Sequence, residues 1–105
     1  MTNHVAVLTA LADPTRRAIF ERLARSPSAV GELARELPVS RPAVSQHLKI
    51  LKSAGLVTDQ PAGTRRVYSV DSAGVAAIRE YFEQFWQQSL ASFRTAASQS
   101  IQEET

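Results

Sequence analysis

The segment Ser40–Ala54 carries side chains that are well suited to contact a nucleic acid. Its apolar residues recur at helical spacing and predict one buried stripe, made of Val44, Leu48 and Leu51. The opposite side of such a helix would expose Pro42, Ser45, Gln46, Lys49 and Lys52. Hydroxyl and amide groups near the start of a helix can bond base edges in the major groove, and lysines near its end can bind phosphates. The alternative is an ordinary amphipathic helix whose lysines are solvated.

Two further side chains of this segment each have more than one possible role. Arg41 lies in the first turn, where it could bond guanine or a phosphate, and the free N–H groups of a helix start also attract phosphate. His47 lies between the buried stripe and the exposed side, so it could bond a phosphate or pack as a boundary histidine. A metal role for His47 is disfavoured because no other ligand is nearby in the sequence. The candidate DNA contacts of the segment are Ser40, Arg41, Pro42, Ser45, Gln46, His47, Lys49 and Lys52.

Four helices are predicted in the first half of the chain, at about residues 3–12, 14–25, 28–37 and 40–54. Capping residues begin the last three of these helices: Asp13, Ser28 and Ser40. Pro27 and Pro38 end the second and the third, because a proline disfavours helical backbone at the residue before it. The third and fourth helices are separated by about three residues, which is the spacing of a helix-turn-helix.

A β-hairpin is predicted directly after the fourth helix. Its strands are Leu56–Thr58 and Arg65–Val70, its turn is Gln60–Thr64, and Val67 should pack inward, with Tyr68 as a second candidate. The end of the turn carries three further candidate DNA contacts: Thr64, Arg65 and Arg66. A basic hairpin beside a recognition helix can reach the DNA backbone or a narrow minor groove. The alternative is that the arginines only keep the hairpin soluble.

A long final helix is predicted from Asp71 or Ser72 to about Ser98, followed by a frayed polar tail at residues 99–105. This helix carries an aromatic stripe made of four of the chain's seven aromatic residues: Phe82, Phe85, Trp86 and Phe93. The other helices already supply apolar sides for a core, so these aromatics favour a symmetric dimer interface. The first helix could join this interface through Val5, Leu8 and Leu11. The alternatives are a place in the core of one chain, or an aromatic box for a cofactor.

Composition limits the classes of protein that the chain could be. Its 105 residues suit one domain, predicted as residues 1–98, and the absence of cysteine excludes disulfides and thiolate metal sites. No apolar run could span a membrane and no secretory signal is visible, so a cytoplasmic protein is expected. Residues 35–66 hold six basic and two acidic side chains, whereas residues 67–105 hold two basic and five acidic side chains. This asymmetry indicates one face for a polyanion, or else a scattered and solvated surface.

Two stretches resemble the ArsR family of bacterial winged-helix repressors: ADPTRR at residues 12–17 and VSRPAVSQHLKILKSAGLV at residues 39–57. The resemblance covers about Val5 to Ser98. It implies a mostly α fold with a small β-hairpin, in the order α-α-α-α-β-β-α, which is a winged helix-turn-helix. It also implies a homodimer, formed through the first and last helices, that represses transcription by binding a palindromic double-stranded DNA operator.

The resemblance is to a branch of the family that works without metal. The family's arsenic-type site has cysteines beside the third helix, where this chain has Val30–Glu36 with none. Its zinc-type site uses Asp and His on the last helix, where this chain has Glu80 and Glu83 but no histidine. Two carboxylates without imidazole make a poor transition-metal site and are better explained as a solvated acidic face. No metal or cofactor is therefore expected, and no inducer can be identified.

Two other classes of function are less favoured. A winged-helix module that binds proteins instead of DNA should carry apolar or acidic groups on the exposed side of residues 40–54, which is polar and basic here. An enzyme would need a pocket with convergent titratable groups, and the chain has no G-x-S-x-G motif and no phosphate-cradling glycine loop.

Overall fold

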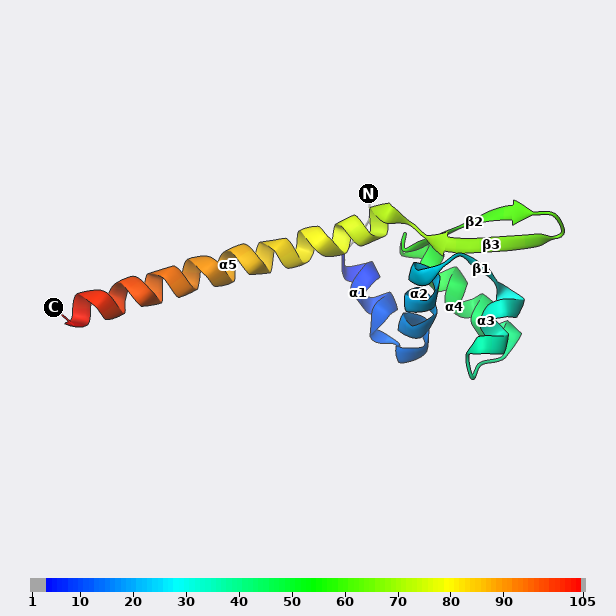
Figure 1. Cartoon of the computed structure of the whole chain (residues 1–105), viewed down its shortest axis with the longest axis horizontal. Helices are drawn as coiled ribbons and strands as arrows, with labels where there is room; N and C mark the ends of the chain where they lie inside the picture. Colours follow the sequence, from blue (N-terminus) through cyan, green and yellow to red (C-terminus); the bar gives the residue numbers. More distant parts are fainter. Residues whose placement is uncertain (1–3, 105) are drawn as a thin grey trace.

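The computed structural model describes residues 4–104, and the side chains of residues 4–101. The elements of this part run in the order α1 (His4–Ala12), α2 (Pro14–Arg25), β1 (Ser28–Ala29), α3 (Val30–Glu36), α4 (Arg41–Ser53), β2 (Val57–Ala62), β3 (Arg65–Val70) and α5 (Ser72–Glu104). Helices α1 to α4 pack together beside the antiparallel sheet, and α5 leaves this unit as a long arm (Figure 1). The predicted order of helices and hairpin is confirmed, with one short strand in addition.

The start of α2 follows the prediction from its capping residue. The Asp13 carboxylate accepts hydrogen bonds from the backbone N–H groups of Thr15 at 2.9 Å and Arg16 at 3.0 Å. The bond from the Arg16 backbone is the main reason that the pKa of Asp13 is lowered. Pro14 occupies the first turn, where its missing N–H leaves no bond unmade. Asp13 therefore fixes the direction in which α2 leaves α1.

The prediction that Ser28 caps the third helix is wrong. Ser28 and Ala29 form strand β1, which pairs antiparallel with β3 through Ser28–Tyr68 and Ala29–Val67. Helix α3 begins only at Val30 and has no side-chain cap. Ser28 is buried, and its Oγ has no hydrogen-bond partner among the described residues. The local sequence pattern indicated a cap because it contains no information about a pairing partner forty residues away.

The hairpin is longer and its turn is tighter than predicted. Strand β2 continues through Pro61, and the turn consists of Gly63 and Thr64. Gly63 has a φ of +65°, which suits the first central position of a two-residue hairpin turn. The sheet order is β1-β3-β2, so β2 is an edge strand and tolerates a proline. Tyr68 and Val70, rather than Val67, pack against the core.

The core lies where α1 to α4 meet the base of the hairpin. Its largest fully buried side chains are Ile19, Leu33, Leu48, Leu51, Leu56, Val7 and Val44. Helix α5 joins it only near its start, through Ile78 and a close approach at Gly74. A Cβ built on Gly74 would lie 2.4 Å from the carbonyl oxygen of Gly55, so only glycine lets α5 begin this close to the end of α4.

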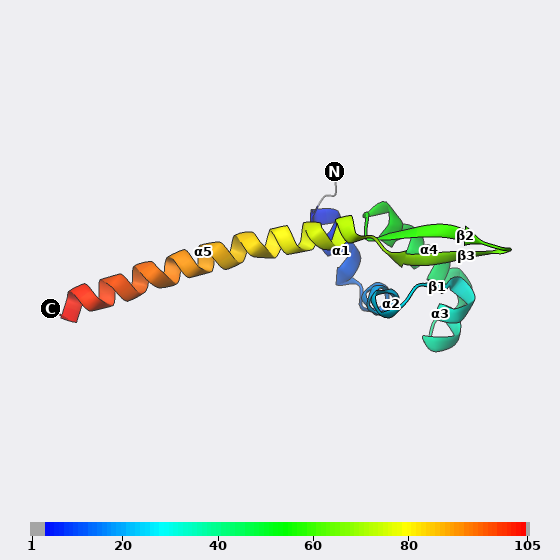
Figure 2. The same cartoon turned by 45° about the horizontal axis from the view of Figure 1, so that its top comes forward.

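Beyond its first turns, α5 has no packing partner within the described chain. It projects away from the helical unit in both views (Figures 1 and 2). The radius of gyration is 19.4 Å, against about 13 Å for a compact domain of about 100 residues. The predicted helix end near Ser98 is wrong, because the helix continues to Glu104. No glycine or proline follows Gly74, and alanine and glutamine favour helix in this last stretch.

Candidate nucleic-acid interface

Helix α4 presents the side chains that its sequence pattern assigned to each face. The Ser40 Oγ accepts a hydrogen bond from the backbone N–H of Ala43 at 3.3 Å and caps the helix. The predicted stripe of Val44, Leu48 and Leu51 is fully buried. The opposite side is exposed and includes all the candidate contacts assigned to it, Arg41, Pro42, Ser45, Gln46, Lys49 and Lys52, together with Ser53 and the partly exposed Ile50. The buried stripe therefore fixes a polar and basic surface in one orientation.

His47 lies at the boundary between the two faces of α4. It is half-buried, and its Nδ1 is buried without a hydrogen-bond partner among the described residues. Its ring is near enough to Asp13 that a positive charge on it would lower the pKa of that carboxyl. This position fits the boundary interpretation, and a contact between His47 and phosphate stays a prediction.

The hairpin β2–β3, here called the wing, holds its two arginines in ion pairs. An Arg65 Nη lies 2.9 Å from Glu32 of α3, and the Arg66 Nε lies 2.6 Å from Asp59 of β2. Both arginines remain more than half exposed, so each keeps N–H groups that could reach a ligand. The sequence pattern had left these arginines either facing DNA or merely solvated. It did not predict that Arg65 would tie the wing to α3 or that Arg66 would pair with the neighbouring strand.

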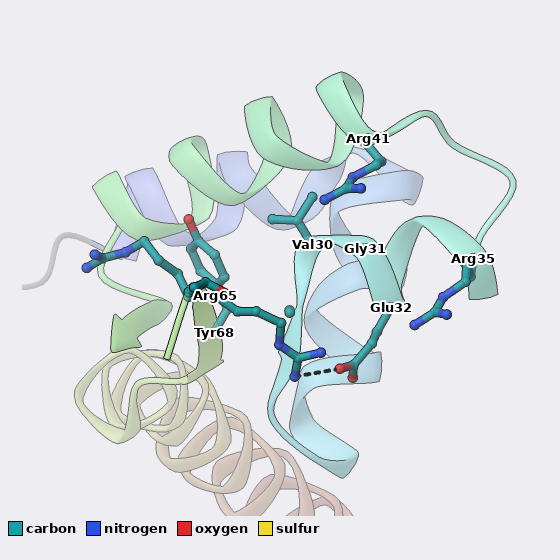
Figure 3. A pocket seen from close by; sticks show the side chains of 10 residues that line it. Val30, Gly31, Glu32, Arg35, Arg41, Arg65 and Tyr68 are labelled. Carbon is teal, nitrogen blue, oxygen red and sulfur yellow. Dashed lines mark ion pairs between the residues drawn. The ribbon is translucent and has the colours of Figure 1, made fainter. Parts of the chain in front are cut away.

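A hollow of about 330 Å³ lies between α3, the start of α4 and the wing. Figure 3 shows Arg41 from α4, Arg35 from α3 and Arg65 from the wing around this hollow, with the Glu32–Arg65 pair beside them. Within the described part of the chain, neither Arg35 nor Arg41 makes an ion pair within 4.0 Å. The hollow therefore has an excess of positive charge next to the exposed side of α4, which suits a polyanion.

Asp59 joins α4 to both strands of the wing. Its Oδ1 lies 2.7 Å from the Nζ of Lys52, and its Oδ2 lies 2.6 Å from the Nε of Arg66. Its side chain is only 6% exposed. Hydrogen bonds from Lys52 and then from Arg66 hold the pKa of Asp59 below its ordinary value. Neither Asp59 nor Arg35 was among the predicted site residues, because only the folded chain brings them to this surface.

The predicted dimer residues of α5 form an apolar surface that its own chain does not cover. Phe82, Phe85, Trp86 and Phe93 are all exposed, with 60% of Trp86 and 72% of Phe93 accessible. The alternative that they fill the core of one chain is thereby contradicted. On α1, Val5 is exposed and Leu8 is half-buried, whereas Leu11 packs partly against the core. The two helices meet where the His4 ring stacks on Tyr81 at 4.6 Å.

Known proteins are similar to this chain in both sequence and fold. Residues 11–60 match a family described as a helix-turn-helix domain. The chain is 67% identical to the HTH-type transcriptional regulator Rv2034 of Mycobacterium tuberculosis, over 80% of this chain and 78% of that protein. It is 46% identical to the HTH-type transcriptional repressor SmtB of the same species, over 69% of this chain and 53% of that protein.

Solved structures extend the similarity to the whole winged unit. An ArsR-like transcriptional regulator from Rhodococcus sp. RHA1 is 33% identical, with a TM-score of 0.71, over 89% of this chain and 91% of that one. The chain belongs to the ArsR family. A second relative, Mb0332 from Mycobacterium bovis, is described as a homodimeric winged helix-turn-helix DNA-binding domain and as a possible ArsR-family transcriptional regulator. It is 30% identical, with a TM-score of 0.65, over 80% of this chain and 78% of that one.

Membership of the ArsR family makes this chain a transcriptional regulator, a class of protein that is not an enzyme class. Its winged helix-turn-helix fold is the one that the sequence predicted. Among the residues that the structure describes, no group of three or more His, Cys, Asp and Glu side chains is placed to hold a metal ion. No helix in the same part of the chain is long and apolar enough to cross a bilayer.

Proposed function

We propose that this ArsR-family chain is a homodimeric repressor that binds a palindromic DNA operator through the major groove. The observation that carries the proposal is the orientation of α4, whose buried stripe directs a polar and basic side outward beside a basic wing. This side has neither the apolar nor the acidic character that a protein-binding module would need. Because the operator would lie on the bacterial chromosome, we place the protein in the cytoplasm.

The exposed residues of α4 divide into two roles in this proposal. Arg41, Ser45 and Gln46 lie near the start of the helix, where side chains reach base edges in helix-turn-helix complexes. Lys49 and Lys52 lie further along the helix and suit backbone phosphates. Arg65 and Arg66 of the wing would contact the backbone or the adjacent minor groove with the N–H groups that their ion pairs leave free.

The exposed aromatic surface of α5 supports the homodimer in this proposal. A contiguous exposed apolar surface of this kind commonly marks a site of protein–protein contact. A two-fold pair of α5 helices, joined by α1, would cover it with an identical copy. The relative Mb0332 is described as homodimeric, which agrees with this assembly. We also assign the chain to the metal-independent branch of the family, since it has no cysteine for an arsenic-type site.

Selection of bound duplexes from a random pool tests the proposed function directly. The purified protein should enrich a palindrome with two half-sites about one helical turn apart, because a two-fold dimer presents two α4 helices to one face of the DNA. Enrichment of a single half-site would contradict the dimer. A pool that stays random through several rounds would contradict sequence-specific binding altogether.

Binding to the selected duplex should weaken steeply as salt rises. A protein that neutralises about six to ten phosphates loses ~10³–10⁵ in affinity between about 50 and 200 mM salt, because released counterions drive the association. Fluorescence anisotropy titrations at four or more salt concentrations would measure the slope. A nearly flat response would show that the basic surface of α4 and the wing does not face the DNA backbone.

Gln46→Ala and Lys49→Ala should separate base reading from phosphate binding. We expect Gln46→Ala to lose about 1–3 kcal/mol of preference at one base pair, and Lys49→Ala to weaken binding to all sequences about equally. Titration of single-base variants of the selected duplex against both proteins would measure the difference. Uniform losses for both variants would refute the two roles assigned to the exposed residues of α4.

A further inference from the structure

One carboxylate links the three elements that would meet DNA. Asp59 belongs to β2, Lys52 to the last turn of α4, and Arg66 to the start of β3. Each oxygen of Asp59 has its own cation, at 2.7 Å and 2.6 Å. We propose that Asp59 is a positioning residue that holds the wing against α4 and thereby sets how sharply the protein discriminates between DNA sequences. This inference rests on the proposed function.

The other ion pairs of the described chain do not make this link. Arg22 pairs with Glu36 between α2 and α3, away from the wing. Arg65 and Glu32 form one ion pair that connects the wing to α3 rather than to α4. Among the described residues, only Asp59 combines two cationic partners with a direct connection from the wing to α4.

The two separate contacts of Asp59 explain why the link should persist on DNA. Phosphates compete for Lys52 and Arg66, but each cation contacts a different oxygen of Asp59, so loss of one ion pair leaves the other in place. Each cation has more than one N–H group, so it can keep Asp59 and still offer a donor to a phosphate. Lys52 and Arg66 therefore stay directed along the seam between α4 and the wing, and the two elements dock as one rigid unit.

The rigid link matters for specificity more than for overall affinity. Base contacts need α4 and the wing to enter neighbouring grooves at a fixed separation, whereas attraction to phosphates tolerates displacement. Loss of the Asp59 charge should then have two opposite effects. The extra net positive charge favours DNA of any sequence, and the loosened wing disfavours the sequence-specific complex.

Asp59→Asn tests the proposal, with Glu32→Gln as the matched control. Both changes remove one negative charge and break an ion pair of the wing, but only Asp59→Asn cuts the link to α4. The probes are the selected palindrome and a scrambled duplex of equal length. We expect Asp59→Asn to lose at least about tenfold of the preference between them, equal to ~1.4 kcal/mol. Its affinity for the scrambled duplex should be unchanged or higher.

The control and the double variant decide whether Asp59 acts by position. Glu32→Gln should tighten both duplexes alike and keep the preference. Lys52→Gln combined with Asp59→Asn should discriminate no worse than Asp59→Asn alone, because both changes break the same link. A general loss of folding would instead weaken both duplexes alike. The proposal would be overturned if Asp59→Asn kept the wild-type preference for the palindrome. It would also be overturned if Glu32→Gln lost as much of this preference as Asp59→Asn.

Hydrogen exchange of the free protein provides a readout that needs no DNA. Amides of residues 60–66 should exchange faster in Asp59→Asn than in Glu32→Gln, while those of α2 and α4 stay protected. Unchanged exchange in the wing would show that Asp59 does not hold it. Failure of the random-pool selection would refute the proposed function instead, and the exchange result would still decide whether the link exists.

Discussion

Trp86→Asp is expected to convert the dimer into monomers and to abolish tight operator binding. Trp86 lies in the middle of the exposed aromatic surface of α5, with Phe82 and Phe93 about one or two turns away. A buried interface tryptophan contributes at least ~2 kcal/mol when truncated, and a carboxylate in its place would also be buried without a partner. The expected result is a dimer dissociation constant raised by at least about thirtyfold.

Sedimentation velocity over a range of protein concentrations would measure this change. Gln84→Asp is the matched control, because it places the same charge on the opposite side of the same helix and should leave the dimer intact. DNA binding by monomeric Trp86→Asp should fall by about 10²–10⁴, since the two half-sites are no longer bound together. A dimer that survives Trp86→Asp would show that α5 does not form the interface.

The same variant should also lose helix. An isolated helix in water is marginal unless tertiary contacts support it, and α5 beyond its first turns has none within the described chain. Circular dichroism at 222 nm should therefore decrease in Trp86→Asp and stay unchanged in Gln84→Asp. The arm seen in Figures 1 and 2 would then be a structure that depends on the second copy.

Leu48→Ala is expected to destabilise the protein by about 2–5 kcal/mol, the usual cost of a cavity left by a buried leucine. Leu48 is fully buried and lies at the centre of the stripe that orients α4. Helix α4 packs against α2, α3 and β2, so little room exists for the site to collapse. The variant should unfold at a lower urea concentration and lose DNA binding in proportion to the unfolded fraction.

The neighbouring variant Lys49→Ala is the control for this experiment. Lys49 is exposed, and a surface change away from caps and partners usually alters stability by less than about 0.5 kcal/mol. Both proteins must be compared at one concentration, because the stability of a dimer depends on concentration. Similar unfolding midpoints for the two variants would mean that the stripe does not anchor α4.

Local features of the fold could be predicted from the sequence with good detail. Asp13 and Ser40 cap α2 and α4 as expected, because capping depends on residues two or three positions away. The stripe of Val44, Leu48 and Leu51 is buried as expected, because helical periodicity places these residues on one face. Ser28 was predicted wrongly, because its role depends on pairing with β3 and no residue near Ser28 in the sequence indicates that pairing.

The sequence by itself determined the helices, the two faces of α4, the family, and the surplus of aromatic residues on α5. The helices, the two faces of α4 and the surplus of aromatic residues follow from composition and from spacing within a few turns of chain. The family follows from the resemblance of residues 12–17 and 39–57 to ArsR sequences. Only the tertiary structure decided that β1 completes the sheet, that Glu32 holds Arg65, and that Asp59 joins Lys52 to Arg66. The physical reason is that these contacts depend on which distant segments meet in the folded chain. The position of a charged residue in the sequence does not indicate which oppositely charged residue will lie beside it.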